Sequence, residues 1–305
     1  MTTQFGLIIV GDEILSGKRA DKHMPKVIDL LAARGLQLAY ADYVGDDPAR
    51  ITAVLARAFA AARESGDVVF SCGGIGATPD DHTRQCAASA LGVDLALQPE
   101  AERLIRERMQ DIAKEQGVPY EPDRHDNIHR LNMGMFPTGA DIIPNPYNKI
   151  PGFSYFADSP IQQGPRNGLR PAAGAAAPPG GRELHEVSDR GGVHFLPGFP
   201  VMAWPMIEWL LDTHYAGLHQ KSAYAEKSVI VMGSMEATLT PLMVAIEASH
   251  SGVKVFSLPS VDHPEYGRHV ELGVKGSPDS VNAAYSAMLA GLHLLDAKLG
   301  PELVR

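Results

Sequence analysis

The sequence predicts an α/β protein: a mostly parallel sheet covered by helices on both faces, followed by a second, smaller α+β domain. From residue 5 to residue 71, short apolar runs alternate with segments whose apolar residues recur every three to four positions. Strands and helices that alternate at this spacing are typical of a parallel sheet with crossover helices. After about residue 220 the order changes to strand, helix, two strands and helix, which is typical of a separate α+β layer.

Each element is expected from its own local pattern. The apolar run Phe5–Val10 stops at Gly11, as a buried strand would, and the acid–acid–proline triplet at 46–48 is typical of a capped helix start. Gly35 and Gly66 follow periodic apolar segments, where helices end. In the first domain we expect strands at 5–10, 36–44, 67–71, 141–143 and 193–196, and helices at 24–34, 48–65, 99–117 and 200–211. In the tail we expect strands at 227–232, 253–257 and 269–274, and helices at 238–249 and 279–299.

The length of 305 residues favours two domains, which we place at residues 1–217 and 218–305. The segment 131–151 is rich in Pro, Gly and Asn and is expected to be loop around one short strand. Residues 159–181 consist mostly of Pro, Gly and Ala and contain no acid, so they have little apolar surface with which to order themselves. We therefore expect a flexible insertion at 159–190 within the first domain; a linker between domains is the alternative.

Composition excludes several classes of protein. The net charge of −9 argues against a nucleic-acid binder, and 45% hydrophobic residues argue against wholesale disorder. Two cysteines, Cys72 and Cys86, are too few for a disulfide scaffold or a four-cysteine zinc site. We find neither a basic leader nor a run of about 18 apolar residues. The expectation is a cytoplasmic protein that contacts neither membrane nor nucleic acid.

The segment with the most chemical information is 71–83, which follows an expected strand and opens a helix. Its glycines let backbone N–H groups approach an anion, and the helix N-terminus adds its positive end. Two adjacent acids suit a phosphate loop only if a cation, such as hydrated Mg²⁺, lies between carboxylate and phosphate. A tight turn with an aspartate as helix cap is the alternative. The residues concerned are Gly73, Gly74, Gly76, Thr78, Asp80, Asp81 and Thr83.

Two other expected strands also end in glycine and acid: Gly11-Asp12-Glu13, with Ser16 nearby, and Gly45-Asp46-Asp47. The carboxyl ends of parallel strands share one edge of a sheet, where open α/β sheets bind ligands. We therefore expect a crevice that binds a cation or hydroxyl groups; capped helix starts are the alternative. The run from Gly11 to Arg19 lacks the spacing of a P-loop, which argues against an ATPase of that class.

His125 and His129 are spaced like the two histidines of a metal-binding helix. Asp126 stands where the zinc-protease pattern has Glu, and no third ligand is evident. A polar helix end explains this pair better than a metal does.

These motifs together resemble the MoaB/Mog-type molybdopterin-binding domain, in the form found in the CinA family (competence/damage-inducible protein A). Further segments match in the same order: Phe136-Pro137, Asn145-Pro146, Pro151-Gly152-Phe153 and Leu196-Pro197-Gly198-Phe199-Pro200. The resemblance covers about residues 5–215 and implies a three-layer α/β/α fold with the ligand over the glycine loop. The tail resembles the small middle domain of CinA proteins.

The resemblance also implies roles for individual residues. In the molybdenum-cofactor branch, the acid that corresponds to Asp81 serves molybdopterin adenylylation with Mg²⁺, and Asp46 is its counterpart on the neighbouring strand. In the CinA branch, the domain is linked to metal-dependent hydrolysis of ADP-ribose. Ala77 replaces the usual loop proline, and Asp80 replaces the Arg of the Mog branch, which favours the CinA branch. Relatives form dimers and trimers, so a homo-oligomer is expected.

The expected site follows from these motifs. Asp46 and Asp81 are the predicted catalytic residues and the predicted ligands of a divalent metal, Mg²⁺, Mn²⁺ or Co²⁺. The residues expected to bind a molybdopterin or nucleotide are Gly11, Asp12, Glu13, Ser16, Gly73, Gly74, Ile75, Gly76, Ala77, Thr78, Asp80, Thr83, Asn145, Pro151 and Gly152. Three hypotheses stay open: a metal-dependent pyrophosphatase acting on ADP-ribose or a similar dinucleotide, a non-catalytic binding module, and an interaction protein with a vestigial pocket.

Overall fold

A computed structural model describes residues 3–159, 190–219 and 225–304 of the chain. The chain divides into two compact units, residues 1–219 and 220–305, each of which is described by itself. The insertion expected at 159–190 lies almost wholly outside the described residues. In the part of the chain that is described, no helix is both long and apolar enough to cross a membrane.

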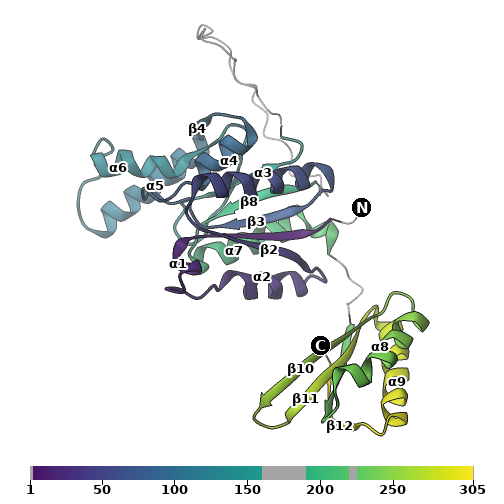
Figure 1. Cartoon of the computed structure of the whole chain (residues 1–305). Coiled ribbons are helices and arrows are strands. Elements are labelled where there is room, and N and C mark those ends of the chain that lie inside the picture. The colour runs from purple at the N-terminus through teal and green to yellow at the C-terminus, as the bar shows by residue number, and fades with distance from the viewer. Residues whose placement is uncertain (1–2, 160–189, 220–224, 305) are drawn as a thin grey trace. The chain divides into compact units, whose positions relative to one another are not determined.

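The first unit is built on a six-stranded, mostly parallel sheet, as the sequence predicts (Figure 1). The order across the sheet is β2 (Leu38–Val44), β1 (Phe5–Val10), β3 (Val68–Cys72), β8 (Gly192–Leu196), β7 (Gly152–Phe156) and β6 (Asp141–Ile143). Strands β2, β1, β3 and β8 run parallel, whereas β7 is antiparallel to both of its neighbours.

Helices cover both faces of this sheet, which gives the expected three layers. All six residues of β1 are buried, because alternate side chains enter cores on opposite faces. Leu7 and Ile9 pack with α2 (His23–Ala32) and α7 (Pro200–His214). Ile8 and Val10 pack with α3 (Pro48–Glu64) and α4 (Thr83–Leu91).

The remaining elements of the first unit are short or lie outside the main sheet: α1 (Asp12–Leu15), α5 (Pro99–Glu115), α6 (His125–Arg130), the antiparallel pair β4 (Leu95–Leu97) and β5 (Met135–Pro137), and 3₁₀ turns at Leu131–Gly134 and Ala216–Leu218. The expectation that 131–151 is loop around one strand was incomplete, because β5 lies there and β7 follows directly. β5 pairs with β4, which is distant in sequence, and β7 pairs both with the preceding β6 and with the distant β8.

The second unit is a four-stranded antiparallel sheet in the order β10, β11, β9, β12, with a core that it shares with α8 and α9. Its elements are β9 (Ala225–Met232), α8 (Glu236–Ser249), β10 (Lys254–His263), β11 (Gly267–Gly276), α9 (Pro278–Leu294) and β12 (Lys298–Val304). The helix expected to reach residue 299 ends at Leu294, and Asp296 turns the chain with a φ of 53°. The chain then pairs along β9, which would otherwise be an unpaired edge.

Candidate functional site

Four parallel strands bring their carboxyl ends to one edge of the first sheet, where a cavity of about 370 Å³ lies. The cavity brings together most of the residues expected at the site. Those that line it are Gly11, Glu13, Asp46, Gly73, Gly74, Ile75, Gly76, Ala77, Thr78, Asp80 and Asp81. Val10, Arg19, Pro197, Gly198 and Phe199 complete the lining. We call this the glycine-loop cavity.

The glycine loop has a conformation that only glycine adopts without strain. Gly73 and Gly74 have φ values of 110° and 68°. A Cβ atom on Gly73 would collide with the carbonyl oxygen of Val10, and one on Gly74 with Oγ1 of Thr83. Thr83 in turn donates its hydroxyl to the Gly73 carbonyl at 3.1 Å and its N–H to the Gly74 carbonyl at 3.0 Å. Thr83 therefore shapes the loop from beneath and does not line the cavity.

Three side chains hold the far part of the loop. Oδ2 of Asp81 accepts hydrogen bonds from the Thr78 N–H at 2.7 Å and from the Thr78 hydroxyl at 2.6 Å. The buried Arg84 donates to the Ile75 carbonyl. His129 Nε2 lies 3.0 Å from the Ala77 carbonyl oxygen, which it can meet only as a donor. His129 thus supports the loop, in line with a polar rather than a metal-binding role.

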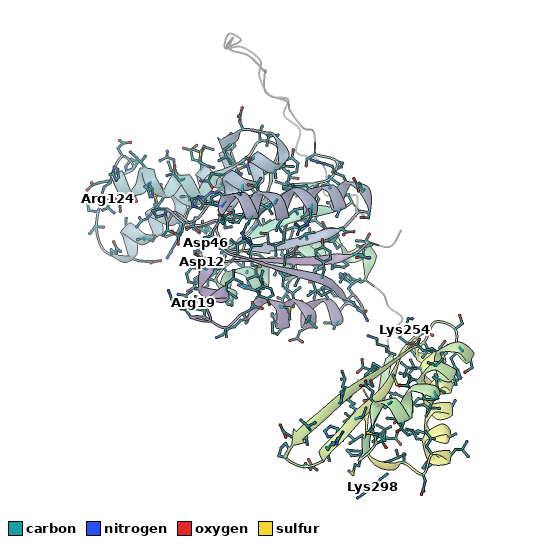
Figure 2. The ribbon with its side chains drawn as sticks, in the orientation of Figure 1. Asp12, Arg19, Asp46, Arg124, Lys254 and Lys298 are labelled. Carbon is teal, nitrogen blue, oxygen red and sulfur yellow. The ribbon has the colours of Figure 1, made fainter. Side chains whose placement is uncertain are left out.

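Asp12 and Asp46 tie the ends of β1 and β2 together (Figure 2). Asp46 Oδ2 accepts the Asp12 N–H at 3.0 Å, and Asp12 Oδ1 accepts the Asp46 N–H at 3.2 Å. A Cβ on Gly45 would collide with Oδ1 of Asp12, so this pairing requires the glycine. The next acid, Asp47, caps α3 by accepting the Arg50 N–H at 2.8 Å. Of the two neighbouring acids, Asp47 caps the helix and Asp46 lines the cavity.

The carboxylates of the glycine-loop cavity crowd one another. Partial burial is the largest cause that raises the pKa of Asp46 above its usual range. The negative charges of Asp12, Glu13 and Asp80 raise the pKa of Asp46 further, and the hydrogen bond from the Asp12 N–H opposes them. The ionised form of Asp46 is therefore disfavoured in the folded protein, and a bound cation would offset this effect.

A divalent cation fits this donor set. Among the described residues, no group of three or more His, Cys, Asp or Glu side chains forms a ready-made metal cluster. Mg²⁺, however, is usually held by one or two carboxylates together with substrate phosphates and water. Asp46 and Asp81 line the cavity, and Oδ1 of Asp81 accepts no hydrogen bond from the described residues. Both side chains therefore carry the hard oxygen donors that Mg²⁺ prefers.

Some of the expected site residues lie elsewhere. Asn145 organises its own turn: its amide donates to Asn148 Oδ1 at 2.8 Å and to the Ile150 carbonyl at 2.9 Å. Pro151 and Gly152 lead into β7, where a Cβ on Gly152 would collide with the backbone of Phe195. These three residues and Ser16 line neither this cavity nor its neighbour described next.

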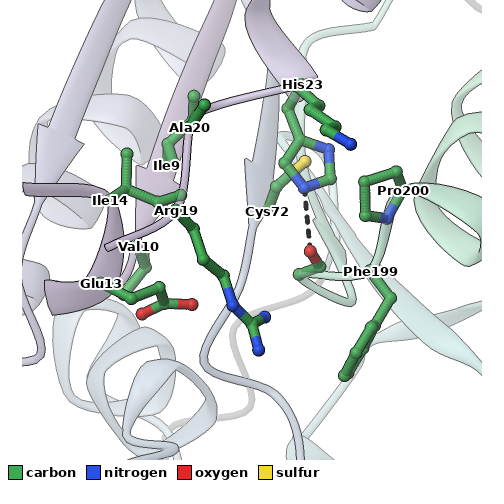
Figure 3. Close-up of a pocket in the computed structure, with 12 residues that line it drawn as sticks. Ile9, Val10, Glu13, Ile14, Arg19, Ala20, His23, Cys72, Phe199 and Pro200 are labelled. Carbon is green, nitrogen blue, oxygen red and sulfur yellow. Dashed lines mark hydrogen bonds between the residues drawn. The ribbon is translucent and has the colours of Figure 1, made fainter. Parts of the chain in front are cut away.

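A second cavity, also of about 370 Å³, adjoins the first (Figure 3). We call it the basic cavity, because Arg19, Lys22 and His23 line it together with Glu13. Ile9, Val10, Ile14, Ala20, Cys72, Gly198, Phe199 and Pro200 complete the lining. Sequence reasoning missed the three basic residues. Their one signal was their place in and directly after the loop that follows a strand ending at the ligand-binding edge.

Residues 6–216 match the family described as a probable molybdopterin binding domain. A CinA-like protein of Anaeromyxobacter dehalogenans (strain 2CP-C) is 27% identical over 252 residues, which cover 82% of this chain and 51% of that protein. A protein of Pyrobaculum calidifontis is 24% identical over 295 residues, which cover 96% of this chain and 95% of that protein.

The solved structure of a CinA protein of unknown function from Thermoplasma acidophilum is 24% identical, covers 69% of this chain and 98% of that one, and has a TM-score of 0.47. The chain spans between about a third and half of the length of the CinA-like relatives from Anaeromyxobacter. The family match covers more than two thirds of the chain and includes every residue that lines the two cavities. The chain therefore belongs to the molybdopterin-binding domain family.

Proposed function

We propose that this protein binds a phosphorylated nucleotide or pterin in the glycine-loop cavity and hydrolyses the pyrophosphate bond of ADP-ribose or a similar dinucleotide with a divalent metal. The observation that carries the proposal is the presence of Asp46 and Asp81 on the lining of the same cavity as the glycine loop. The family match and the CinA-like names of relatives support a ligand of this kind.

The residues of the chain would divide the work. The N–H groups of the glycine loop would bind phosphate oxygens, as successive backbone N–H groups bind anions. Asp46 and Asp81 would hold Mg²⁺, Mn²⁺ or Co²⁺. When bound, such a cation neutralises charge on phosphoryl oxygens and activates water. The Asp12 N–H would orient the Asp46 carboxylate, and the two donors of Thr78 would orient that of Asp81.

The test is release of AMP from ADP-ribose with each of the three metals. We expect turnover with at least one metal, none in EDTA, and a loss of about 100-fold or more in Asp46→Asn and Asp81→Asn. Asp29→Asn, an exposed acid on α2 outside both cavities, is the matched control and should retain full activity. Absence of turnover with every metal, on folded protein, would refute the enzymatic proposal.

A non-catalytic binding module is the second candidate, and one observation favours it. Oδ2 of Asp81 already accepts two hydrogen bonds from Thr78, which suits a structural role in shaping the loop. A binding module should bind nucleotide or pterin without turnover, and Asp46→Asn should leave its affinity unchanged. An interaction protein with a vestigial pocket should bind neither. Assembly into dimers or trimers stays a prediction, to be measured by light scattering.

A further inference from the structure

The two cavities adjoin one another. Their linings share Val10, Glu13, Arg19, Gly198 and Phe199. Figure 3 shows the Arg19 side chain extended toward the space between Glu13 and Phe199. Each cavity by itself is near the lower end of the volumes that bury a small ligand, and a ligand that fills both has room for two groups.

Charge is distributed unevenly along this double cavity. Asp46, Asp80 and Asp81 line only the glycine-loop end, and Lys22 and His23 line only the other. Among the residues that the structure describes, Arg19 is the one Arg or Lys in the lining of the glycine-loop cavity. Within the described residues, no carboxylate lies within 4.0 Å of the Arg19 guanidinium as an ion-pair partner. A phosphate near the acids needs a cation, whereas a phosphate near Arg19 does not.

Part of the lining of the basic cavity is apolar. Ile9, Ile14, Cys72 and Pro200 contribute to it, and Phe199, which borders both cavities, is 55% exposed. An exposed aromatic side chain beside a guanidinium suits a ligand in which a planar ring is linked to a phosphate. The aromatic side chain offers a stacking surface for the planar ring, and the guanidinium beside it binds the phosphate.

The wall of the basic cavity is fixed before any ligand binds. His23 Nε2 lies 3.1 Å from the Gly198 carbonyl oxygen, and the His23 N–H donates to Asp21 Oδ1 at 2.7 Å. Asp21 also accepts the Tyr43 hydroxyl at 2.8 Å, which ties the loop to β2. A preformed wall lowers the ordering cost of binding.

We propose that the basic cavity is the second half of the ligand site. It binds the end of a nucleoside diphosphate ester that carries the planar base. Arg19 binds the phosphate at that end without a metal. This inference rests on the proposed function only in that a phosphorylated ligand occupies the glycine-loop cavity. Arg19 and Phe199 then determine the ligand class: Arg19 requires the phosphate and Phe199 favours the attached ring.

Calorimetric titration in EDTA tests the proposal with two probes, ADP-ribose and inorganic pyrophosphate. Arg19→Met should weaken the binding of ADP-ribose about tenfold or more, because a charge-assisted hydrogen bond is lost. Lys18→Met is the matched control: it removes the neighbouring exposed cation, which lines neither cavity, and should change affinity less than about twofold. Phe199→Ala should weaken ADP-ribose binding and leave pyrophosphate binding unchanged.

Three results would overturn the proposal: no binding of ADP-ribose to the wild-type protein in EDTA, equal losses in Arg19→Met and Lys18→Met, or equal losses of both probes in Phe199→Ala. Failure of the proposed function looks different, because it is the absence of AMP release in the presence of metal. Binding in EDTA and turnover with metal are thus separate readouts.

Discussion

Two clusters of polar side chains in the same sheet differ in whether their polar groups have partners within the protein. At the carboxyl edge, Asp46 and its neighbouring acids surround an open cavity and repel one another. Inside the sheet, His194 is fully buried between Ser154 on β7 and Tyr215 after α7. Its Nδ1 lies 2.7 Å from the Ser154 hydroxyl and its Nε2 lies 2.6 Å from the Tyr215 hydroxyl.

The difference indicates that the inner cluster contributes to stability and the outer cluster to ligand binding. Burial, with smaller effects from His214 and Arg190, lowers the pKa of His194 to about 3, so the inner cluster is neutral and both ring nitrogens have partners. The outer cluster retains charge that the protein does not neutralise. Changes in the inner cluster should therefore reduce the free energy of unfolding, and changes in the outer cluster should reduce ligand binding.

The largest expected effect is that of His194→Ala. This substitution leaves a cavity and two buried hydroxyl groups without their partner, and should lower the free energy of unfolding by about 3 kcal/mol. Urea denaturation measures the change, with His125→Ala on the exposed start of α6 as the control. A loss below about 1 kcal/mol would show that the inner cluster is not a determinant of stability.

Gly74→Ala tests whether the loop conformation itself is required. Alanine at a φ of 68° is strained, and here its Cβ would also collide with Thr83 Oγ1. We expect a loss of about 2–3 kcal/mol in unfolding free energy, together with loss of nucleotide binding. Gly117→Ala, at a φ of 66° with no atom within 4 Å of the added Cβ, isolates the strain and should cost about 1–2 kcal/mol. Equal losses in both variants would mean that the contact with Thr83 is unimportant.

Acid should destabilise the first unit through His194. The folded-state pKa of about 3 lies below the ordinary value of 6.5, so the unfolded chain binds the extra proton. The stability that neutral His194 contributes is complete above pH 6.5 and is lost as the pH falls toward 3, by up to about 1.4 kcal/mol per pH unit. Denaturation midpoints between pH 7 and pH 4.5 measure it. A variant with His194→Gln should show a shallower dependence, and an identical dependence would contradict the assignment to His194.

The smallest expected effect is a gain in stability. Because the pKa of Asp46 is raised, its ionised form is disfavoured in the folded state. Asp46→Asn should therefore raise Tm at pH 7 by about 1–2 °C, and the gain should shrink at pH 4, where Asp46 itself takes up a proton. Asp29→Asn is again the control. A lower Tm at pH 7 would mean that the carboxylate stabilises this edge of the sheet.

The sequence predicted the parts of this structure that depend on local pattern. Val10 and Cys72 end buried apolar runs, and the glycines and acids that follow them lie around one cavity because parallel strands end at one edge. Strands β5 and β12 were missed because they pair with segments distant in sequence. Gly300 and Pro301 resemble a turn, and β12 accommodates them as an irregularity in its pairing with β9.

The basic cavity was not predicted from the sequence for a similar reason. Arg19 and Lys22 are exposed cations in a loop, where such residues are common without function. They line a cavity only together with Gly198 and Phe199, which follow β8 and come close to them only in the folded sheet. Asn145 matches a family motif and shapes its own turn; its role in binding stays a prediction.

The most direct test of the account is the thermal stability of the full chain with ADP-ribose, with and without Mg²⁺. At 100 times its dissociation constant, a ligand stabilises by about 2.7 kcal/mol, which is several degrees for a domain of this size. We predict a rise in Tm with ADP-ribose alone, a larger rise with Mg²⁺, and loss of the Mg²⁺ increment in Asp46→Asn. No rise with ADP-ribose under either condition would contradict the assignment of this edge of the sheet as a nucleotide site.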